Sequence, residues 1–476
     1  MTVSPCRSNF FVKYKDLYQF LLTVQENCLK NNCRQIVSIS LDIDWVDPLV
    51  VLDKLTQANE INFYFENQGK GEAIAAIDTV AKLEIDGKER FTQAEYFIKS
   101  CLKNIINFGS TNQSFAKPHF FCYFSFFDQN TQADYPFPCA TIFLPRWQIT
   151  VKNQRCILIQ NILINASVNI EKILQNLHSK IELIQSLEYY STNLDSLQSK
   201  FNKKSVTNAT DFKRSVVSIL EKIQSSHLNK IVLANALDVN SSSQFNLFKS
   251  LDNLRKMHPN CYIFSTSNGK GQNFIGASPE RLISINNQKL ITDALAGSAP
   301  RGKTPVEDAA NANRLLNSVK ERHEHALVID FITQRLSQLG LLPQVLAPRL
   351  RQLSNIQHLW TPISAIVPVN VHPLKIVSQL HPTPAVAGAA RDFACAEIRR
   401  YESFERGLYA APLGWIDANG NCEFIVGIRS ALIDGDRARL YAGAGIVAGS
   451  NPDKEFAEVQ LKLQALLKAL DNSHNP

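Results

Sequence analysis

Several features that would assign this chain to a class of protein are missing from it. None of its apolar runs reaches about 18 residues, the length of a membrane-spanning helix. The N-terminal residues Met1–Arg7 do not combine a charged segment with a following apolar stretch, so no secretory signal is predicted. We therefore expect a protein that is neither inserted in a membrane nor secreted.

The ten cysteines form no recognisable framework, because they are scattered and include no Cys-x-x-Cys pair. In a chain of 476 residues, this pattern is typical of free thiols in a reducing compartment. It also contains no spacing that predicts a zinc site. We expect a cytoplasmic protein without disulfide bonds.

A strong charge of one sign is missing as well. Lys and Arg total 50 against 43 Asp and Glu, which leaves a net charge of +7. The basic residues are dispersed although the pI is about 8.8, so a nucleic-acid partner is not expected. Hydrophobic residues make up 45% of the chain, enough to form a large core, which excludes a disordered protein.

The chain divides into two parts of different composition. Residues 1–205 are rich in Asn, Gln, Ser and Phe, and the aromatic run 120–127 predicts a buried strand. Residues 210–470 contain groups of apolar strands separated by amphipathic helices. This arrangement predicts a mixed α/β fold with much antiparallel pairing. The polar stretch 190–208 is the predicted boundary between the parts.

Three long segments of the second part have simple patterns. The apolar runs 274–285 and 423–432 each predict a strand. The segment 306–339 predicts a helical region that is broken near Asn317.

Two Glu-x-x-Glu pairs are the first candidates for chemistry. Glu321 and Glu324 lie three residues apart on a helix that the capping box beginning at Ser318 predicts. Glu455 and Glu458 have the same spacing at the start of the last helix. Four carboxylates offer the hard oxygen ligands that Mg²⁺ uses. Alone, the first pair is better explained as a solvated charged helix, and neither pair is specific by itself.

Three charged residues interrupt apolar segments. Lys230 opens an apolar strand, Glu280 follows a Ser-Pro turn, and Arg429 is a lone charge in an apolar run. In a cleft, such a Lys can act as a base, such a Glu as a general acid, and such an Arg as the partner of an anionic ligand. The simpler alternatives are a lysine that reaches water, a turn carboxylate paired with Arg281, and an arginine paired with a protein carboxylate.

Small residues at strand ends leave room for a ligand. Gly297 and Ser298 can offer a backbone N–H and a hydroxyl, and Gly443 and Gly445 expose backbone that can approach an anion. Lys462 lies one helical turn beyond the second glutamate pair. An ordinary Gly-rich loop is the alternative at both places.

Taken together, these segments resemble the chorismate-binding enzymes, a family of isochorismate, salicylate, anthranilate and aminodeoxychorismate synthases. The resemblance covers about residues 210–470 and rests on motifs in the order found in the family: KIVLA at 230–234, GASPERL at 276–282, TDALAGSAPRG at 292–302, KERHEH at 320–325, QHL at 357–359, LHPTPAVAG at 380–388, LYAAPLGW at 408–415, EFIVGIRS at 423–430, YAGAGIVAGS at 441–450 and EFAEVQLKL at 455–463. It implies one large α/β fold with two big, mostly antiparallel sheets and surrounding helices, to which residues 1–205 also belong.

The resemblance also implies a role for each residue. Lys230 matches the base that activates water for attack at C2 of chorismate, and Glu280 matches the acid that protonates the departing C4 hydroxyl. Glu324 and Glu458 match direct Mg²⁺ ligands, while Glu321 and Glu455 match residues that hold metal-bound water. Positions around the substrate are matched by Gly297, Ser298, His358, Tyr409, Arg429, Gly443, Gly445 and Lys462.

Within the family, the residues favour an isochorismate synthase. Relatives that make aminodeoxychorismate have a nucleophilic Lys where this chain has Ala296. Anthranilate synthases lack the base Lys and take ammonia from a partner, so no glutamine amidotransferase is expected. Salicylate synthases share Lys230 and Glu280 and remain the alternative, together with a non-catalytic chorismate-binding regulatory protein.

The resemblance thus predicts a monomeric, Mg²⁺-dependent isomerase that converts chorismate to isochorismate. The product would feed menaquinone, phylloquinone, siderophore or salicylate synthesis, and the sequence does not choose among them.

Overall fold

The computed structural model describes residues 6–109, 114–132, 134–187, 201–225 and 229–471. Two large sheets of 12 and 10 strands form its centre, and almost all their pairings are antiparallel. The predicted mixed α/β fold with two mostly antiparallel sheets is therefore confirmed. Among the described residues, every helix is too short or too polar to span a membrane.

The larger sheet contains strands from both parts of the chain. Its order is β10 (Phe201–Ser205), β11 (Lys230–Ser241), β22 (Arg437–Val447), β21 (Ser430–Asp434), β13 (Gln272–Ser278), β12 (Tyr262–Asn268), β2 (Ile61–Asn67), β3 (Glu72–Ile77), β8 (Trp147–Lys152), β9 (Arg155–Ile164), β1 (Gln35–Ile43) and β5 (Ile105–Gly109). The β1–β5 pair is parallel.

The smaller sheet also contains strands from both parts of the chain. Its order is β16 (Gln344–Val345), β18 (Ile356–Ile366), β15 (Lys289–Pro300), β14 (Arg281–Asn286), β20 (Cys422–Val426), β19 (Pro412–Asp417), β6 (His119–Phe124), β7 (Ala140–Leu144) and β4 (Ala81–Ile85), with β17 (Arg349–Gln352) also paired to β18. β2 pairs with β12, and β6 pairs with β19, so residues before and after the predicted boundary share both sheets.

The predicted boundary at 190–208 falls partly outside the described residues, which omit 188–200. Its later residues, Phe201–Ser205, form β10 at the edge of the larger sheet.

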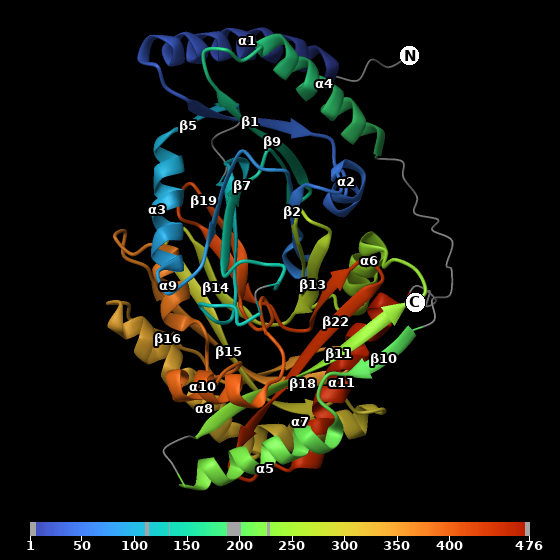
Figure 1. Ribbon diagram of the computed structural model, residues 1–476. Helices are drawn as coiled ribbons and strands as arrows, with labels where there is room; N and C mark the ends of the chain where they lie inside the picture. Colours follow the sequence, from blue (N-terminus) through green and yellow to red (C-terminus); the bar gives the residue numbers. More distant parts are fainter. Residues whose placement is uncertain (1–5, 110–113, 133, 188–200, 226–228, 472–476) are drawn as a thin grey trace.

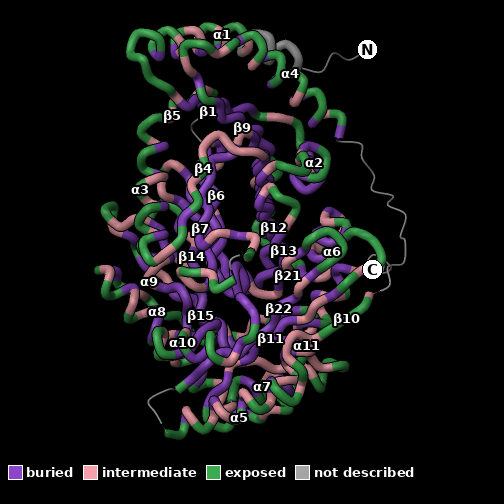
Figure 2. The backbone as a smooth tube through the Cα atoms, viewed as in Figure 1, coloured by how far each residue is buried: buried purple, intermediate pink, exposed green. Residues whose placement is uncertain are grey.

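Helices surround the two sheets. They are α1 (Cys6–Asn31), α2 (Pro48–Leu55), α3 (Arg90–Lys103), α4 (Ile170–Ser186), α5 (Ala209–Ser225), α6 (Leu247–Met257), α7 (Pro305–Asn317), α8 (Val319–Gln338), α9 (Pro373–Leu380), α10 (Arg391–Tyr401) and α11 (Pro452–Leu470). Figure 1 shows α1 and α4 at one end of the molecule and α5 and α7 at the other. Exposed residues concentrate on these helices, while the central strands are largely buried (Figure 2).

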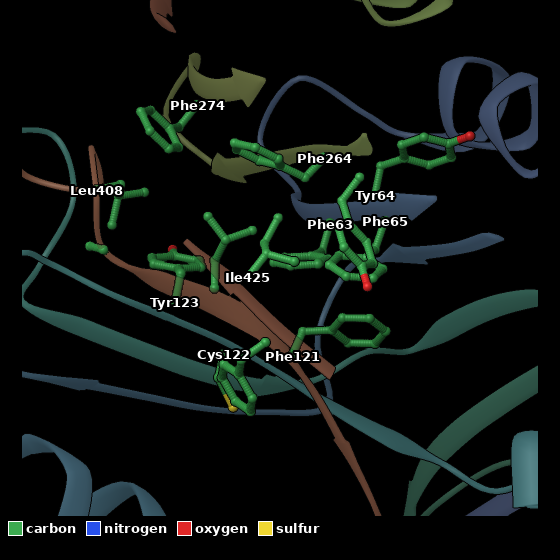
Figure 3. Close-up of a cluster of buried hydrophobic side chains, with 14 of the residues drawn as sticks. Phe63, Tyr64, Phe65, Phe121, Cys122, Tyr123, Phe264, Phe274, Leu408 and Ile425 are labelled. Carbon is green, nitrogen blue, oxygen red and sulfur yellow. The ribbon is translucent and has the colours of Figure 1, made fainter. Parts of the chain in front are cut away.

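The core lies between the facing sheets and is strongly aromatic. Figure 3 shows Phe63 and Phe65 of β2 close to Phe121 of β6. The Phe63 and Phe121 ring centroids are 5.1 Å apart, and both side chains are fully buried. Burial of such large side chains is the main stabilising contribution to a core. The aromatic run predicted as a buried strand is buried through Phe126, as β6 and the start of the loop after it, while Phe127 is half-buried.

Two strand predictions were wrong in an informative way. Segment 274–285 forms β13 in the larger sheet and β14 in the smaller one, and segment 423–432 forms β20 and β21, again in different sheets. The apolar pattern continues through each break because both sheets bury their strands, so periodicity alone does not reveal the crossing. Glu280 lies at the first crossing and Arg429 at the second.

Helices α8 and α11 carry the two glutamate pairs. The break near Asn317 is confirmed, since α7 ends there and α8 starts at Val319 with Ser318 accepting a hydrogen bond from the Glu321 N–H. α11 begins at Pro452, with Asn451 as its cap. α8 packs on β15 and α11 on β22, so the two sheets bring both helices to one site.

Candidate active site

A cavity of about 90 Å³ lies where β11, β15 and β22 meet α8 and α11. Most of the residues predicted for the site line it: Glu280, Gly297, Ser298, Glu324, His358, Tyr409, Arg429, Gly443, Gly445, Glu458 and Lys462. Lys230, Glu321 and Glu455 do not line it, but each is ion-paired or hydrogen-bonded within the same cluster. Residues far apart in the chain therefore gather as predicted, although their roles stay predictions.

Lys230, the first residue of β11, is completely buried. Its Nζ lies 2.8 Å from Glu324 Oε1. Burial alone would raise the pKa of the Glu324 carboxyl, but the charge and hydrogen bond of Lys230 outweigh it and lower that pKa. Glu324 thus stands as a carboxylate beside the Lys230 Nζ.

Glu280 is only 3% exposed, at the crossing from β13 to β14. Burial raises the pKa of its carboxyl to about 8, and Asp293 adds to this effect while Lys230 opposes it. The backbone is fixed on both sides, because Ser278 Oγ accepts the Glu280 N–H at 3.2 Å and the Glu280 carbonyl accepts the Val426 N–H at 3.1 Å. At neutral pH, Glu280 therefore presents a protonated carboxyl, the form that a general acid requires.

Lys320 connects the two glutamate pairs, and the sequence reasoning missed it. Its Nζ lies 3.0 Å from Glu455 Oε1 and 3.7 Å from Glu321 Oε1. Burial, followed by the charge of Glu324, raises the pKa of Glu321 to about 7. The available signal was the position of Lys320 directly before the first pair.

Lys462 contacts the second glutamate pair. Its Nζ lies 2.7 Å from Glu458 Oε1 and donates to the Gly443 carbonyl at 2.8 Å. It thereby joins α11 to β22 at the cavity wall.

The carboxylates match Mg²⁺ in their chemistry. Among the described residues, no three Asp, Glu, His or Cys side chains are arranged to hold a metal, because lysines hold Glu324, Glu455 and Glu458. The charges of Glu324 and Glu458 nevertheless both raise the pKa of Glu321, so these acids are close enough to repel one another. A divalent cation would relieve that repulsion, and oxygen-only donors are what Mg²⁺ prefers.

On another wall of the cavity, Arg429 has a positive φ of 50° and a buried Nη1 without a hydrogen-bond partner among the described residues. Its Nη2 lies 3.3 Å from His358 Nε2, and His358 Nδ1 lies 3.0 Å from Ser298 Oγ. Burial, then the charge of Arg429, lowers the pKa of His358, so the imidazole is neutral. An arginine that lines a cavity and buries such an unpartnered N–H calls for an anionic ligand.

Glycines make room where acidic side chains approach the strands. A Cβ at Gly445 would lie 2.7 Å from Glu324 Oε1, and one at Gly297, whose φ is +78°, would lie 3.1 Å from Glu321 Oε2. A Cβ at Gly443 would lie 3.0 Å from the Tyr409 hydroxyl. Because these glycines have no side chain, they leave space for the two glutamates and for the Tyr409 hydroxyl.

The sequence reasoning also missed parts of the wall. Ala385 and Val386, after the His-Pro-Thr-Pro turn, line the cavity with Tyr441 and Val232. Apolar residues in short loops carry no distinguishing pattern, so only their place in a motif could have indicated them.

Comparisons with known proteins agree with this geometry. The chain is 29% identical over 446 residues to the isochorismate synthase MenF of Bacillus subtilis, covering 91% of this chain and 93% of that protein. It is 39% identical over 256 residues to the salicylate biosynthesis isochorismate synthase of Pseudomonas aeruginosa, a match that spans about half of each protein (54% and 53%).

The solved structure of MenF, the menaquinone-specific isochorismate synthase from Escherichia coli, superposes with a TM-score of 0.76 at 26% identity, over 95% of this chain and 100% of that one. The family model of the chorismate binding enzymes matches residues 23–471. This match covers both parts of the chain and the whole cavity. The protein therefore belongs to the chorismate-binding enzyme family.

Proposed function

We propose that this protein is an isochorismate synthase, which converts chorismate to isochorismate by adding water at C2 and expelling the hydroxyl at C4. The observation that carries the proposal is the combination of a buried, protonated acid at Glu280, a buried lysine at Lys230 and an unpaired guanidinium N–H at Arg429 in one cluster. Relatives over nearly the whole chain that are named isochorismate synthases support it.

The substrate would be held through its two carboxylates. Arg429 and Lys462 line the cavity and supply the positive charge that a dianion requires. Mg²⁺, bound by Glu324 and Glu458 with Glu321 and Glu455 holding its water, would offset the charge of the ring carboxylate.

Acid and base would act on opposite faces of the ring. Lys230 takes a proton from the water that forms the new C–O bond at C2, and Glu280 gives its proton to the C4 oxygen, which leaves as water while the ring double bonds shift. Because an ammonium accepts no proton, Lys230 would have to leave its ion pair with Glu324 and release its own proton to solvent before this step.

Water, rather than an amine, is the proposed nucleophile. Ala296 lines the cavity at the position before Gly297, and its methyl group forms no covalent adduct. We propose on this basis that the enzyme needs no glutamine amidotransferase. We further propose that it works as a monomer and, from the names of its relatives, that its product passes to a menaquinone or siderophore pathway.

The test is to incubate the purified protein with chorismate and Mg²⁺ in ¹⁸O-water and to identify the products by mass spectrometry. Label at the C2 oxygen of isochorismate supports the proposal. Salicylate plus pyruvate as the main products would identify a salicylate synthase, anthranilate formed with ammonium would identify an amine-using relative, and binding without turnover would identify a regulatory protein.

The metal requirement is tested separately. Excess EDTA, or either Glu324→Gln or Glu458→Gln, should abolish turnover while circular dichroism stays unchanged. Full activity in EDTA would contradict the Mg²⁺ proposal.

A further inference from the structure

Among the described residues, the strand that carries Lys230 has no neighbouring strand along half of one edge. β11 pairs with β22 over Lys230–Asn240, but on its other side β10 pairs only with Leu237–Ser241. Along residues 230–236, the chain segment after the His-Pro-Thr-Pro turn supplies part of the missing contact. Val232 N–H donates to the Ala387 carbonyl at 2.7 Å, and Ala389 N–H donates to the Lys230 carbonyl at 3.3 Å.

An ion pair completes this edge. Glu402 Oε1 accepts the Ala234 N–H at 2.7 Å, and Arg406 Nη2 donates to the Val232 carbonyl at 2.9 Å. The two side chains are joined by hydrogen bonds of 2.8 Å from Nε to Oε2 and 2.6 Å from Nη2 to Oε1. Their side chains are 0% and 2% exposed, so Arg406 and Glu402 bind the strand where a neighbouring strand would otherwise do so.

Arg406 also holds two other walls of the cavity. Its Nη1 donates to the Val386 carbonyl at 2.8 Å, and its own carbonyl accepts the Tyr409 N–H at 2.8 Å. Val232, Val386 and Tyr409 all line the cavity. The Arg406 side chain therefore links Val232 and Val386, which lie far apart in the chain, and its main chain contacts Tyr409.

We propose that the Arg406–Glu402 pair is the positioning element of the active site: it holds the backbone of β11, and with it Lys230, in register with the opposite cavity wall at Val386 and Tyr409. The catalytic consequence rests on the proposed function, whereas the hold on β11 does not. Neither residue lines the cavity, so both act through others.

The chemistry of the pair suggests how to weaken it without removing it. A planar guanidinium donates in several fixed directions at once, and a lysine ammonium does not reproduce that geometry. Arg406→Lys therefore keeps the charge but loses the simultaneous contacts to Val232, Val386 and Glu402. Glu402→Gln keeps an acceptor for the Ala234 N–H but leaves the buried guanidinium without its counter-charge.

A matched control is available on α6. Arg255 of α6 pairs with Asp47 at 2.8 Å and with Asp252 at 2.9 Å, and none of the three lines the cavity. Arg255→Lys perturbs a partly buried ion pair without touching the site.

The first measurement is hydrogen–deuterium exchange of the full-length protein, read by mass spectrometry on peptides covering residues 230–236. We expect Arg406→Lys to increase uptake in these peptides about tenfold in rate and to leave β12 unchanged, whereas Arg255→Lys changes neither. Should Arg406→Lys fail to fold, Glu402→Gln serves the same purpose. Unchanged uptake in 230–236 would overturn the proposal.

The second measurement is turnover of chorismate, normalised to folded protein. We expect kcat to fall about 100-fold in Arg406→Lys with little change in KM, since small displacements of a catalytic group cost rates of this order. In a Lys230→Ala background the same substitution should cost less than about threefold, because the positioned group is gone. If the kcat losses of the two substitutions multiply instead, or if exchange becomes faster while kcat stays unchanged, the Arg406–Glu402 pair has a structural role only.

The two proposals fail in different ways. If the wild-type protein does not convert chorismate, the proposed function is wrong, and the exchange measurement alone then decides whether the pair holds β11.

Discussion

The two parts of the chain contribute similarly to the sheets but very differently to the cavity. Strands from residues before 205 pair with later strands in both sheets. Every residue that lines the cavity, however, lies between Val232 and Lys462. The early part of the chain builds the support, and the later part supplies the chemistry.

Both parts bury an ionisable atom without a hydrogen-bond partner among the described residues, Arg90 Nε in the early part and Arg429 Nη1 in the later one, but of these two residues only Arg429 lines the cavity. In the early part, the Tyr64 hydroxyl donates to Glu66 at 2.8 Å, and His119 Nδ1 lies 2.8 Å from the Lys117 carbonyl. In the later part, Arg429 buries an N–H without a partner among the described residues. Unsatisfied buried charge costs stability, and it is tolerated where a ligand of opposite charge completes it.

The largest expected effect sharpens this contrast with two matched substitutions of buried glutamates. Glu280→Gln should lower kcat by about 10²–10⁴-fold, because the proton donor is lost. Glu66→Gln, in the early part, should leave kcat within about threefold of wild type, because it removes only a local hydrogen bond. Steady-state assays of both variants measure kcat. Comparable losses of kcat in the two variants would contradict the different contributions of the two parts of the chain.

The next prediction concerns the aromatic core between the sheets. Phe121→Ala should lower the free energy of unfolding by about 3–5 kcal/mol, since it opens a cavity beside Phe63. Denaturant unfolding measures this change. The folded variant, assayed well below its melting temperature, should keep the wild-type KM, and a large rise in KM would show that the core shapes the cavity directly.

A pH profile tests the acid in the free enzyme. With the pKa of Glu280 raised to about 8, its carboxyl is protonated below that pH and loses its proton above it. The logarithm of kcat/KM should therefore fall with a slope of about −1 per pH unit above pH 8. The Glu280→Gln variant provides the control, because its residual rate should lack this limb. A wild-type profile that stays flat to pH 9.5 would exclude Glu280 as the acid.

The smallest expected effect is the loss of stability on removing either of two asparagine helix caps. Asn169 caps α4 and Asn451 caps α11, and replacing either with Ala should cost about 1 kcal/mol of stability. Only Asn451→Ala should also weaken activity at limiting Mg²⁺, because α11 carries Glu455 and Glu458. Thermal melts and Mg²⁺ titrations distinguish the two variants, and an equal effect on Mg²⁺ dependence would contradict the comparison.

Local patterns predicted the helices well. The Ser318 cap marks the start of α8 as expected, because capping depends on residues only a few positions apart. The motifs likewise indicated most residues that line the cavity. The strand pattern was less informative at Glu280 and Arg429, where the chain changes sheets within an apolar run.

The sequence by itself determined the class of fold, the start of α8 and many of the residues that gather at the cavity, because periodicity, caps and motifs are written in neighbouring positions. Only the tertiary structure decided which lysine pairs with which glutamate, as in Lys230–Glu324 and Lys320–Glu455. It alone revealed that Glu402 and Arg406 complete the edge of β11. These contacts join segments that are distant in the chain, and their geometry depends on how the two sheets and their helices pack.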